Sequence, residues 1–246
     1  MGGATRGDKR RKQAAGRSRA AASVRGRKNR TPLIVVAVVL AVAVIVGGVV
    51  LLTQRGSTDV AATYPTTASG AVVTAGNGPV VVDVYEDYLC PACERFEQRY
   101  GNEMTQALND GKITVRYHQI AILDSRTDPP GYSTRAANAA LCSVPAGIFP
   151  AYHKELFAQQ PAEGSAGLSN DQLVAIGTGL GAQGDFASCV TSGRNAAAVA
   201  AETEAAASNP ALQSNGSFGT PTVAIGGTKI DISDPNWLQD AISAGR

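Results

Sequence analysis

Histidine and cysteine are scarce in this chain of 246 residues. Two histidines rule out a histidine-rich metal centre, and four cysteines are too few for the dense disulfide framework of a small secreted scaffold. Charged residues make up 17% of the chain against 44% hydrophobic residues, which excludes disorder over the whole length. At roughly 150 residues per domain, the length allows one or two compact units plus tails.

The small net charge of +2 is the sum of two oppositely charged parts. Residues 1–30 contain 11 Lys or Arg and a single acid, Asp8. From Gly56 onward, 10 Lys or Arg stand against 19 Asp or Glu. Such an asymmetry indicates that the two parts occupy different environments.

An uncharged run of 20 residues, Leu33–Leu52, follows the basic tail. As a helix it would span about 30 Å, the thickness of the hydrocarbon core of a bilayer. Basic residues crowd its N-terminal side, and only Arg55 follows closely on the other. By the positive-inside rule we expect residues 1–32 to be a basic cytoplasmic tail, residues 33–52 to be a single transmembrane helix, and the rest to be extracytoplasmic. Residues 53–69, rich in Thr, Ala, Ser and Gly, predict a flexible linker.

Two alternatives to an anchor were weighed. A cleavable signal peptide usually has an apolar region of about 7–15 residues, shorter than this run, so we favour an uncleaved anchor in the cell membrane. Nucleic-acid binding by the basic tail is disfavoured, because no aromatic residues are interspersed among its Lys and Arg.

The extracytoplasmic part opens with a strand, a cysteine pair and a helix. Val80–Tyr85 is a nearly continuous β-branched run, typical of a strand that is buried on both faces of a sheet. Cys90-Pro91-Ala92-Cys93 follows, and then apolar residues recur at helical spacing from Cys93 to Leu108. Residues 113–120 predict the next strand, so the order strand, helix, strand indicates a right-handed parallel crossover.

The positions of the two cysteines have a chemical consequence. Pro91 suits the first helical turn, which places Cys90 at the helix N-terminus, where free N–H groups stabilise a thiolate. Cys93 lies one turn later on the same face and could resolve a mixed disulfide formed at Cys90.

A zinc site and a purely structural disulfide are the alternatives for this cysteine pair. Zinc would need a second close pair or suitably spaced histidines, and this chain has neither, so we expect no metal.

A second motif, Gly219-Thr220-Pro221-Thr222, lies in the last part of the chain. It precedes Val223-Ala224-Ile225, a Gly226-Gly227 turn and another short β-prone segment, which together predict a hairpin. Pro221 would enter the first strand at a position where a cis peptide is tolerated. A final helix is expected around Trp237 and Leu238.

Taken together, the two motifs resemble those of the DsbA-like thiol-disulfide oxidoreductases, including membrane-anchored actinobacterial forms. The resemblance covers about residues 70–246 and implies a mixed α/β thioredoxin fold (residues 70–132 and 195–246) with a helical insertion (residues 133–194), here preceded by one transmembrane helix. It implies that Cys90 attacks, that Cys93 resolves, and that Pro221 is cis and lies against the pair. The Thr220 backbone would then pair with the substrate chain.

This sequence departs from the family at several positions. Ala92 stands where DsbA oxidases often carry a histidine, and Val84 stands where reductases carry a buried acid. Glu86 is a candidate for proton transfer instead, although we expect it to be a solvated loop acid. Oxidase and isomerase or reductase directions therefore both stay open, as does a non-catalytic anchored binding module.

The expected insertion contains the other two cysteines, Cys142 and Cys189, in two different predicted helices. In an oxidising compartment we expect them to form a structural disulfide, and two separate buried thiols are the alternative. His118 is expected to be structural, His153 to be a surface or packing residue, and Glu94 and Glu97 to lie on a solvated helix face, so none of the four is expected to be part of a site.

The resemblance also implies function and partners. Oxidised Cys90–Cys93 would introduce disulfides into unfolded, reduced exported proteins, and a quinone-linked membrane protein of the DsbB or VKOR type would reoxidise the pair. No cofactor is expected.

Overall fold

A computed structural model describes residues 60–245 of the chain. The predicted cytoplasmic tail, the predicted transmembrane helix and residues 53–59 of the predicted linker lie outside these residues. Within residues 60–245, every helix is too short or too polar to cross a bilayer.

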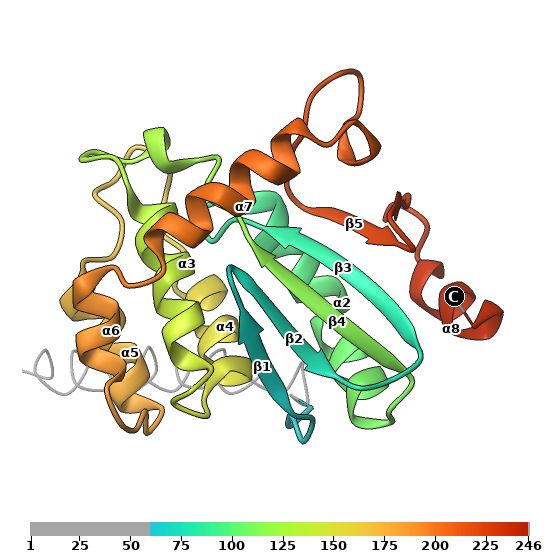
Figure 1. Ribbon diagram of the computed structural model, residues 1–246, viewed down its shortest axis with the longest axis horizontal. Coiled ribbons are helices and arrows are strands. Elements are labelled where there is room, and N and C mark those ends of the chain that lie inside the picture. The colour runs from blue at the N-terminus through green and yellow to red at the C-terminus, as the bar shows by residue number, and fades with distance from the viewer. Residues whose placement is uncertain (1–59, 246) are drawn as a thin grey trace, which may run out of the picture. The chain divides into compact units, whose positions relative to one another are not determined.

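The described strands form one mixed sheet in the order β1-β2-β4-β3-β5-β6 (Figure 1). Their bounds are β1 Thr66–Ser69, β2 Val72–Gly76, β3 Val80–Glu86, β4 Ile113–Gln119, β5 Thr222–Ile225 and β6 Thr228–Lys229. The strands β3 and β4 pair in parallel, whereas every other neighbouring pair is antiparallel. The expected parallel crossover and the expected hairpin are therefore confirmed.

The strand β3 lies inside the sheet, between β4 and β5. Val82 and Val84 are fully buried, as expected for a β-branched run covered on both faces. At the sheet edge, residues 66–69 differ from expectation: we assigned them to the linker, but they form β1 because they pair with β2 in a tight hairpin.

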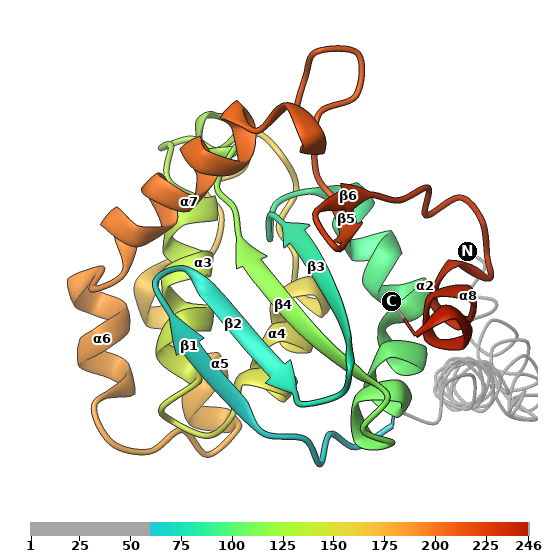
Figure 2. The ribbon, with the colours of Figure 1, turned by 45° about the vertical axis from the view of Figure 1, so that its right-hand side comes forward.

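The helices and short 3-10 turns connect these strands. Their bounds are α2 Pro91–Asn109, η2 Asp124–Arg126, α3 Tyr132–Ser143, α4 Phe149–Ala158, α5 Asn170–Gly179, α6 Phe186–Ser192, α7 Ala196–Ser208, η3 Pro210–Leu212 and α8 Trp237–Ala244. In both ribbon views α3, α5 and α6 gather beside the sheet, on the side away from β5 and α8 (Figures 1 and 2). The insertion is thus a helical group at one side of the sheet.

The helix α2 packs through the apolar stripe that its spacing predicted. Every member of this stripe is buried, namely Cys93, Phe96, Tyr100, Met104 and Leu108. Trp237 of α8 packs on it, with ring centroids 6.3 Å from Phe96 and 5.7 Å from Tyr100. The final helix therefore packs against the buried face of α2.

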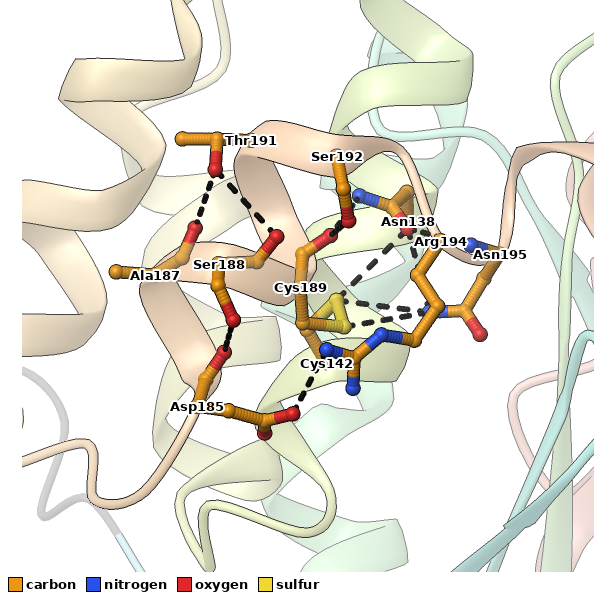
Figure 3. Close-up of polar contacts among 10 residues, drawn as sticks. All are labelled: Asn138, Cys142, Asp185, Ala187, Ser188, Cys189, Thr191, Ser192, Arg194 and Asn195. Carbon is orange, nitrogen blue, oxygen red and sulfur yellow. Dashed lines mark hydrogen bonds and ion pairs between the residues drawn. A yellow bond between two sulfur atoms is a disulfide. The ribbon is translucent and has the colours of Figure 1, made fainter.

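A disulfide joins two helices of the insertion (Figure 3). Cys142 of α3 and Cys189 of α6 are bonded, and both are almost fully buried. The side-chain nitrogen of Asn195 lies 3.5 Å from the Cys142 sulfur and 3.7 Å from the Cys189 sulfur. Asn138 in turn accepts a hydrogen bond from the Asn195 backbone N–H at 2.8 Å, so a small polar network encloses the bond.

On the face of the sheet opposite to α2, a network of charged side chains holds α7. His118 of β4 bonds Asp83 of β3 at 3.0 Å and Glu202 of α7 at 2.7 Å. Arg116 forms two hydrogen bonds to the same Asp83 carboxylate, and the Tyr85 ring stacks on the His118 ring at 4.0 Å between centroids. Burial alone would lower the pKa of His118, but its hydrogen bonds to the two carboxylates outweigh burial and raise that pKa above its usual value.

This network predicts pH-dependent stability. A histidine whose pKa is raised by folding contributes its full stabilisation below its unfolded pKa of about 6.5 and loses it as pH rises through the folded pKa. We expect the free energy of unfolding of the native chain to exceed that of the His118→Gln variant most near about pH 6 and least in alkaline solution. Urea denaturation of both proteins across this range measures the difference; a difference that grows with pH would contradict the assignment.

The Cys142–Cys189 disulfide predicts a large effect on stability. Cross-linking residues that are 47 apart in sequence constrains the unfolded chain, an effect of about 4 kcal/mol in the chain-entropy treatment. The double variant Cys142→Ala/Cys189→Ala should therefore lower the free energy of unfolding by about 2–4 kcal/mol in urea denaturation. Cys90→Ala/Cys93→Ala, measured in the same way against the reduced native chain, is the control and should fall well short of that loss.

Candidate active site

Cys90 occupies the N-cap of α2. Its backbone is extended, and its carbonyl accepts hydrogen bonds from the N–H groups of Cys93 and Glu94 at 3.0 and 3.2 Å. Pro91 follows in the first turn, as the sequence predicted. Cys90 keeps 8% of its surface exposed, whereas Cys93 is completely buried one turn further on. Of the pair, only Cys90 can be reached from outside.

The Thr220-Pro221 segment lies against Cys90. The peptide bond between these residues is cis, as expected. The Cys90 sulfur is 3.2 Å from the Thr220 carbonyl oxygen, although the residues are 130 apart in sequence. The fold therefore brings together the two motifs that carried the sequence interpretation, and Ala92 lies between the cysteines, half-buried.

The two thiols have opposite electrostatic environments, and both are free in this structure. A hydrogen bond from the Cys93 thiol lowers the pKa of Cys90 to about 5; burial opposes the shift, and the Thr220 side chain and the N–H groups of Ala92 and Cys93 add to it. Burial raises the pKa of Cys93 well above its usual value, and its hydrogen bond to Cys90 and the nearby Glu86 carboxyl act in the same direction. At neutral pH the site therefore holds a Cys90 thiolate beside a protonated Cys93.

Asp87 holds the loop before Cys90 in place. One of its carboxylate oxygens accepts the Leu89 N–H and the other accepts the Leu123 N–H, each at 2.9 Å. Its own carbonyl accepts the Cys90 N–H at 2.9 Å. Asp87 is fully buried, and this burial raises its pKa to about 6. Sequence reasoning missed this residue, because nothing in the sequence distinguishes Asp87 from any other aspartate in a loop.

The insertion also contributes to the site. Gln160, just after α4, donates its side-chain N–H to the carbonyl oxygens of Tyr88 at 3.0 Å and Cys90 at 3.2 Å. His153 of α4 lies 2.8 Å from the Tyr88 hydroxyl through its Nδ1. The loop that carries Cys90 is thus fixed from the side by helices of the insertion.

The expected exposure of two acids was wrong, whereas His153 is a packed residue, one of the two settings expected for it. Glu86 is the last residue of β3 and is almost fully buried, not a solvated loop acid. Glu97 is largely buried, because it lies four residues after Cys93 and three before Tyr100, on the buried side of α2. That spacing could have identified it. His153 is buried among aromatic rings and faces both carboxylates.

Burial dominates the electrostatics of Glu86. It raises the pKa of this carboxyl well above its usual value, and the neighbouring Glu97 carboxyl and Cys90 raise it further. A protonated carboxyl beside the buried Cys93 can pass its proton to the Cys93 thiolate, and the negative charge then moves from the sulfur to Glu86. Glu86 therefore stays a candidate for proton transfer, and its burial makes it a better one than its sequence position suggested.

The comparisons with known proteins agree with this geometry. The family model described as thioredoxin matches residues 67–244. Oxidised DsbA from Mycobacterium tuberculosis is 32% identical, with a TM-score of 0.61 over 74% of this chain and 91% of that chain. Reduced DsbG from the same organism, titled a disulfide bond oxidoreductase, is 31% identical, with a TM-score of 0.60 over 76% and 84% of the two chains.

A curated relative is much longer than this chain. Serine/threonine-protein kinase PknE of Mycobacterium tuberculosis (strain ATCC 25618 / H37Rv) is 29% identical over 175 residues, which are 69% of this chain but 31% of the kinase. The match thus concerns less than a third of that protein. Together, the matched residues, the fold and the paired motifs are decisive: the chain belongs to the thioredoxin family and is a DsbA-like thiol-disulfide oxidoreductase.

Proposed function

We propose that this enzyme works as an oxidase that introduces disulfides into reduced proteins exported from the cell. The observation that carries the proposal is the contrast within the pair: an accessible Cys90 whose pKa is lowered to about 5 and a buried Cys93 whose pKa is raised. The direction of electron flow follows from this contrast.

The reaction starts from the oxidised pair. A client thiolate attacks the Cys90 sulfur, the Cys90–Cys93 bond breaks, and Cys93 takes up a proton as it leaves. A second client thiolate then attacks the client sulfur of the mixed disulfide and releases Cys90 as a thiolate. The client loses two electrons and two protons, and the enzyme pair gains the two electrons.

The stable Cys90 thiolate favours this direction. A thiol of low pKa is a good leaving group, so the second step is fast. The same stabilisation applies only to the reduced enzyme, which makes the oxidised form a stronger oxidant. We therefore place its reduction potential above the roughly −270 mV of thioredoxin. A value near roughly −300 mV would instead favour a reductase.

The surroundings of the pair support a peptide client. The Thr220 backbone lies beside the Cys90 sulfur, where it can pair with an extended client chain during the mixed disulfide. Insulin reduction and recovery of scrambled ribonuclease distinguish the reductase and isomerase alternatives from oxidation of a reduced client.

The proposal includes a location and a partner. The apolar run at residues 33–52 and the basic residues before it support a single-pass anchor with a cytoplasmic N-terminus and an extracytoplasmic enzyme domain. A quinone-linked membrane protein of the DsbB or VKOR type would accept the two electrons from the reduced pair, and the anchor would keep both proteins in one membrane.

The Cys90 thiol should titrate far below an ordinary cysteine. We expect its rate of alkylation in the reduced chain to follow a pKa of about 5. Cys93→Ala removes the hydrogen bond that contributes most to this shift, so it should raise the pKa of Cys90. Alkylation rates measured against pH for both proteins test this. An unchanged profile in Cys93→Ala would contradict the assigned cause.

The two cysteines should fail in different ways when replaced. Cys93→Ser should accumulate mixed disulfides with reduced clients, because no resolving thiol is present, whereas Cys90→Ser should form none and should lose all oxidation of reduced ribonuclease. Gel analysis without reductant detects the adducts. Full activity in Cys90→Ser would leave only a tethered binding module.

A further inference from the structure

Three ionisable side chains from three different elements meet in the core. Glu86 ends β3, Glu97 lies on α2 and His153 lies on α4. The His153 Nε2 is 3.7 Å from a Glu86 oxygen and 3.6 Å from a Glu97 oxygen, and the three ligand atoms all lie within 4.8 Å of one another. We call these residues the Glu86–Glu97–His153 cluster.

Four polar atoms of this cluster have no hydrogen-bond partners. Both oxygens of Glu86, one oxygen of Glu97 and the Nε2 of His153 are buried and unpaired. The side chains of Glu86 and His153 are only 4% and 7% exposed. Unpaired polar atoms in a core are costly and uncommon in folded proteins. Three of these four, Glu86 Oε2, Glu97 Oε1 and His153 Nε2, come together, with both oxygens within 3.7 Å of the nitrogen, which indicates a missing partner.

His153 is oriented toward that place by its other nitrogen. Its Nδ1 is 2.8 Å from the Tyr88 hydroxyl, and aromatic rings of Tyr117 and Phe157 pack around the imidazole. When Nδ1 carries the hydrogen and donates it to the Tyr88 oxygen, the Nε2 lone pair faces the two carboxylates. Histidines that bind metals are characteristically fixed in this way through the second nitrogen.

Gly101 makes room for Glu97. A Cβ at this position would lie 2.9 Å from the second oxygen of Glu97. Because glycine has no side chain, the Glu97 carboxylate can lie back along α2 and keep its other oxygen in the cluster. Glu97 is also the most exposed of the three side chains, at 14%, and it provides a route by which an ion could enter.

We propose that the Glu86–Glu97–His153 cluster binds a divalent metal ion of the zinc type. Zinc bonds of about 2.0–2.2 Å in a tetrahedral site place neighbouring ligands about 3.4 Å apart. The two imidazole–carboxylate separations are a few tenths of an ångström longer, and the two carboxylates lie within 4.8 Å of each other. The carboxylates would therefore move toward each other on binding, and a water molecule would take the fourth position. An imidazole with two carboxylates suits zinc, whereas magnesium and calcium prefer oxygen ligands alone.

Such an ion would connect the parts of the fold. Its ligands come from the central strand, the active-site helix and the insertion, so it would tie α4 to the sheet directly behind the cysteine pair. This inference goes beyond the proposed function and does not depend on it, because none of the three ligands is a thiol.

The experiment separates this site from zinc binding by the cysteines. The full chain carrying Cys90→Ser/Cys93→Ser is dialysed against Zn²⁺, and bound metal is measured by elemental analysis. We expect one ion per chain and a higher melting temperature with Zn²⁺ than with Mg²⁺ or Ca²⁺. Co²⁺ as a probe should give visible bands of four- or five-coordinate nitrogen and oxygen ligation, without the intense charge-transfer band of thiolates.

Single variants in this background identify the ligands. Glu97→Gln and His153→Phe should each weaken Zn²⁺ binding by at least about tenfold, as loss of a ligand or its support does in other sites. Glu94→Gln is the matched control, since Glu94 lies on the same helix and its carboxylate accepts a hydrogen bond from Gln98 at 2.9 Å; this variant should bind Zn²⁺ normally. Circular dichroism checks folding, and if His153→Phe does not fold, Glu97→Gln decides.

Two results would overturn the proposal. The first is the absence of stoichiometric Zn²⁺ in the Cys90→Ser/Cys93→Ser chain, which would mean that the cluster holds only protons. The second is equal binding by Glu97→Gln and Glu94→Gln, which would place the ion elsewhere.

Discussion

The active site depends on a single sulfur atom held at the start of a helix. Cys90 caps α2, its sulfur touches the Thr220 carbonyl, and the Cys93 thiol behind it donates the hydrogen bond that lowers its pKa most. The thiolate exists only when the pair is reduced, so this hydrogen bond stabilises the reduced form alone. It therefore sets both the reactivity of Cys90 and the reduction potential of the enzyme. The remainder of the fold keeps α2, the Pro221 segment and the loop before Cys90 in place relative to one another.

The sequence was sufficient to predict the parts of the site that depend on local pattern. The β-branched run before Cys90, the proline after it and the apolar stripe from Cys93 to Leu108 identify a strand, a helix start and a buried helix face, and the structure has all three. The partner segment at Thr220-Pro221 could be placed beside Cys90 only through the family resemblance. No local signal joins residues that are 130 apart in sequence.

The parts that sequence reasoning misjudged are those whose environment comes from tertiary packing. Glu86 looks like a loop acid in the sequence, but it ends a central strand and is covered by α2 and α4. The sequence left open whether His153 lies on the surface or is packed, and it is buried because α4 packs against α2. Burial of a charged residue is decided by its neighbours in space. Only the burial of Glu97 could have been predicted from the sequence, from its position on the apolar face of its helix.

The helices between α2 and α7 therefore contact the active-site loop directly and do not form an independent cover. Gln160 binds the carbonyl oxygens of Tyr88 and Cys90, and His153 binds the Tyr88 hydroxyl, so residues of the insertion fix the backbone on which the attacking sulfur depends. The Cys142–Cys189 bond holds α3 to α6 within the same helical group. If these helices became mobile, the change would be transmitted to Cys90 through α4, because α3 packs on α4 and α4 contacts the loop that contains Tyr88 and Cys90. Stability of the insertion and reactivity of the thiol pair are thus mechanically linked, although the two cysteine pairs have separate chemical roles.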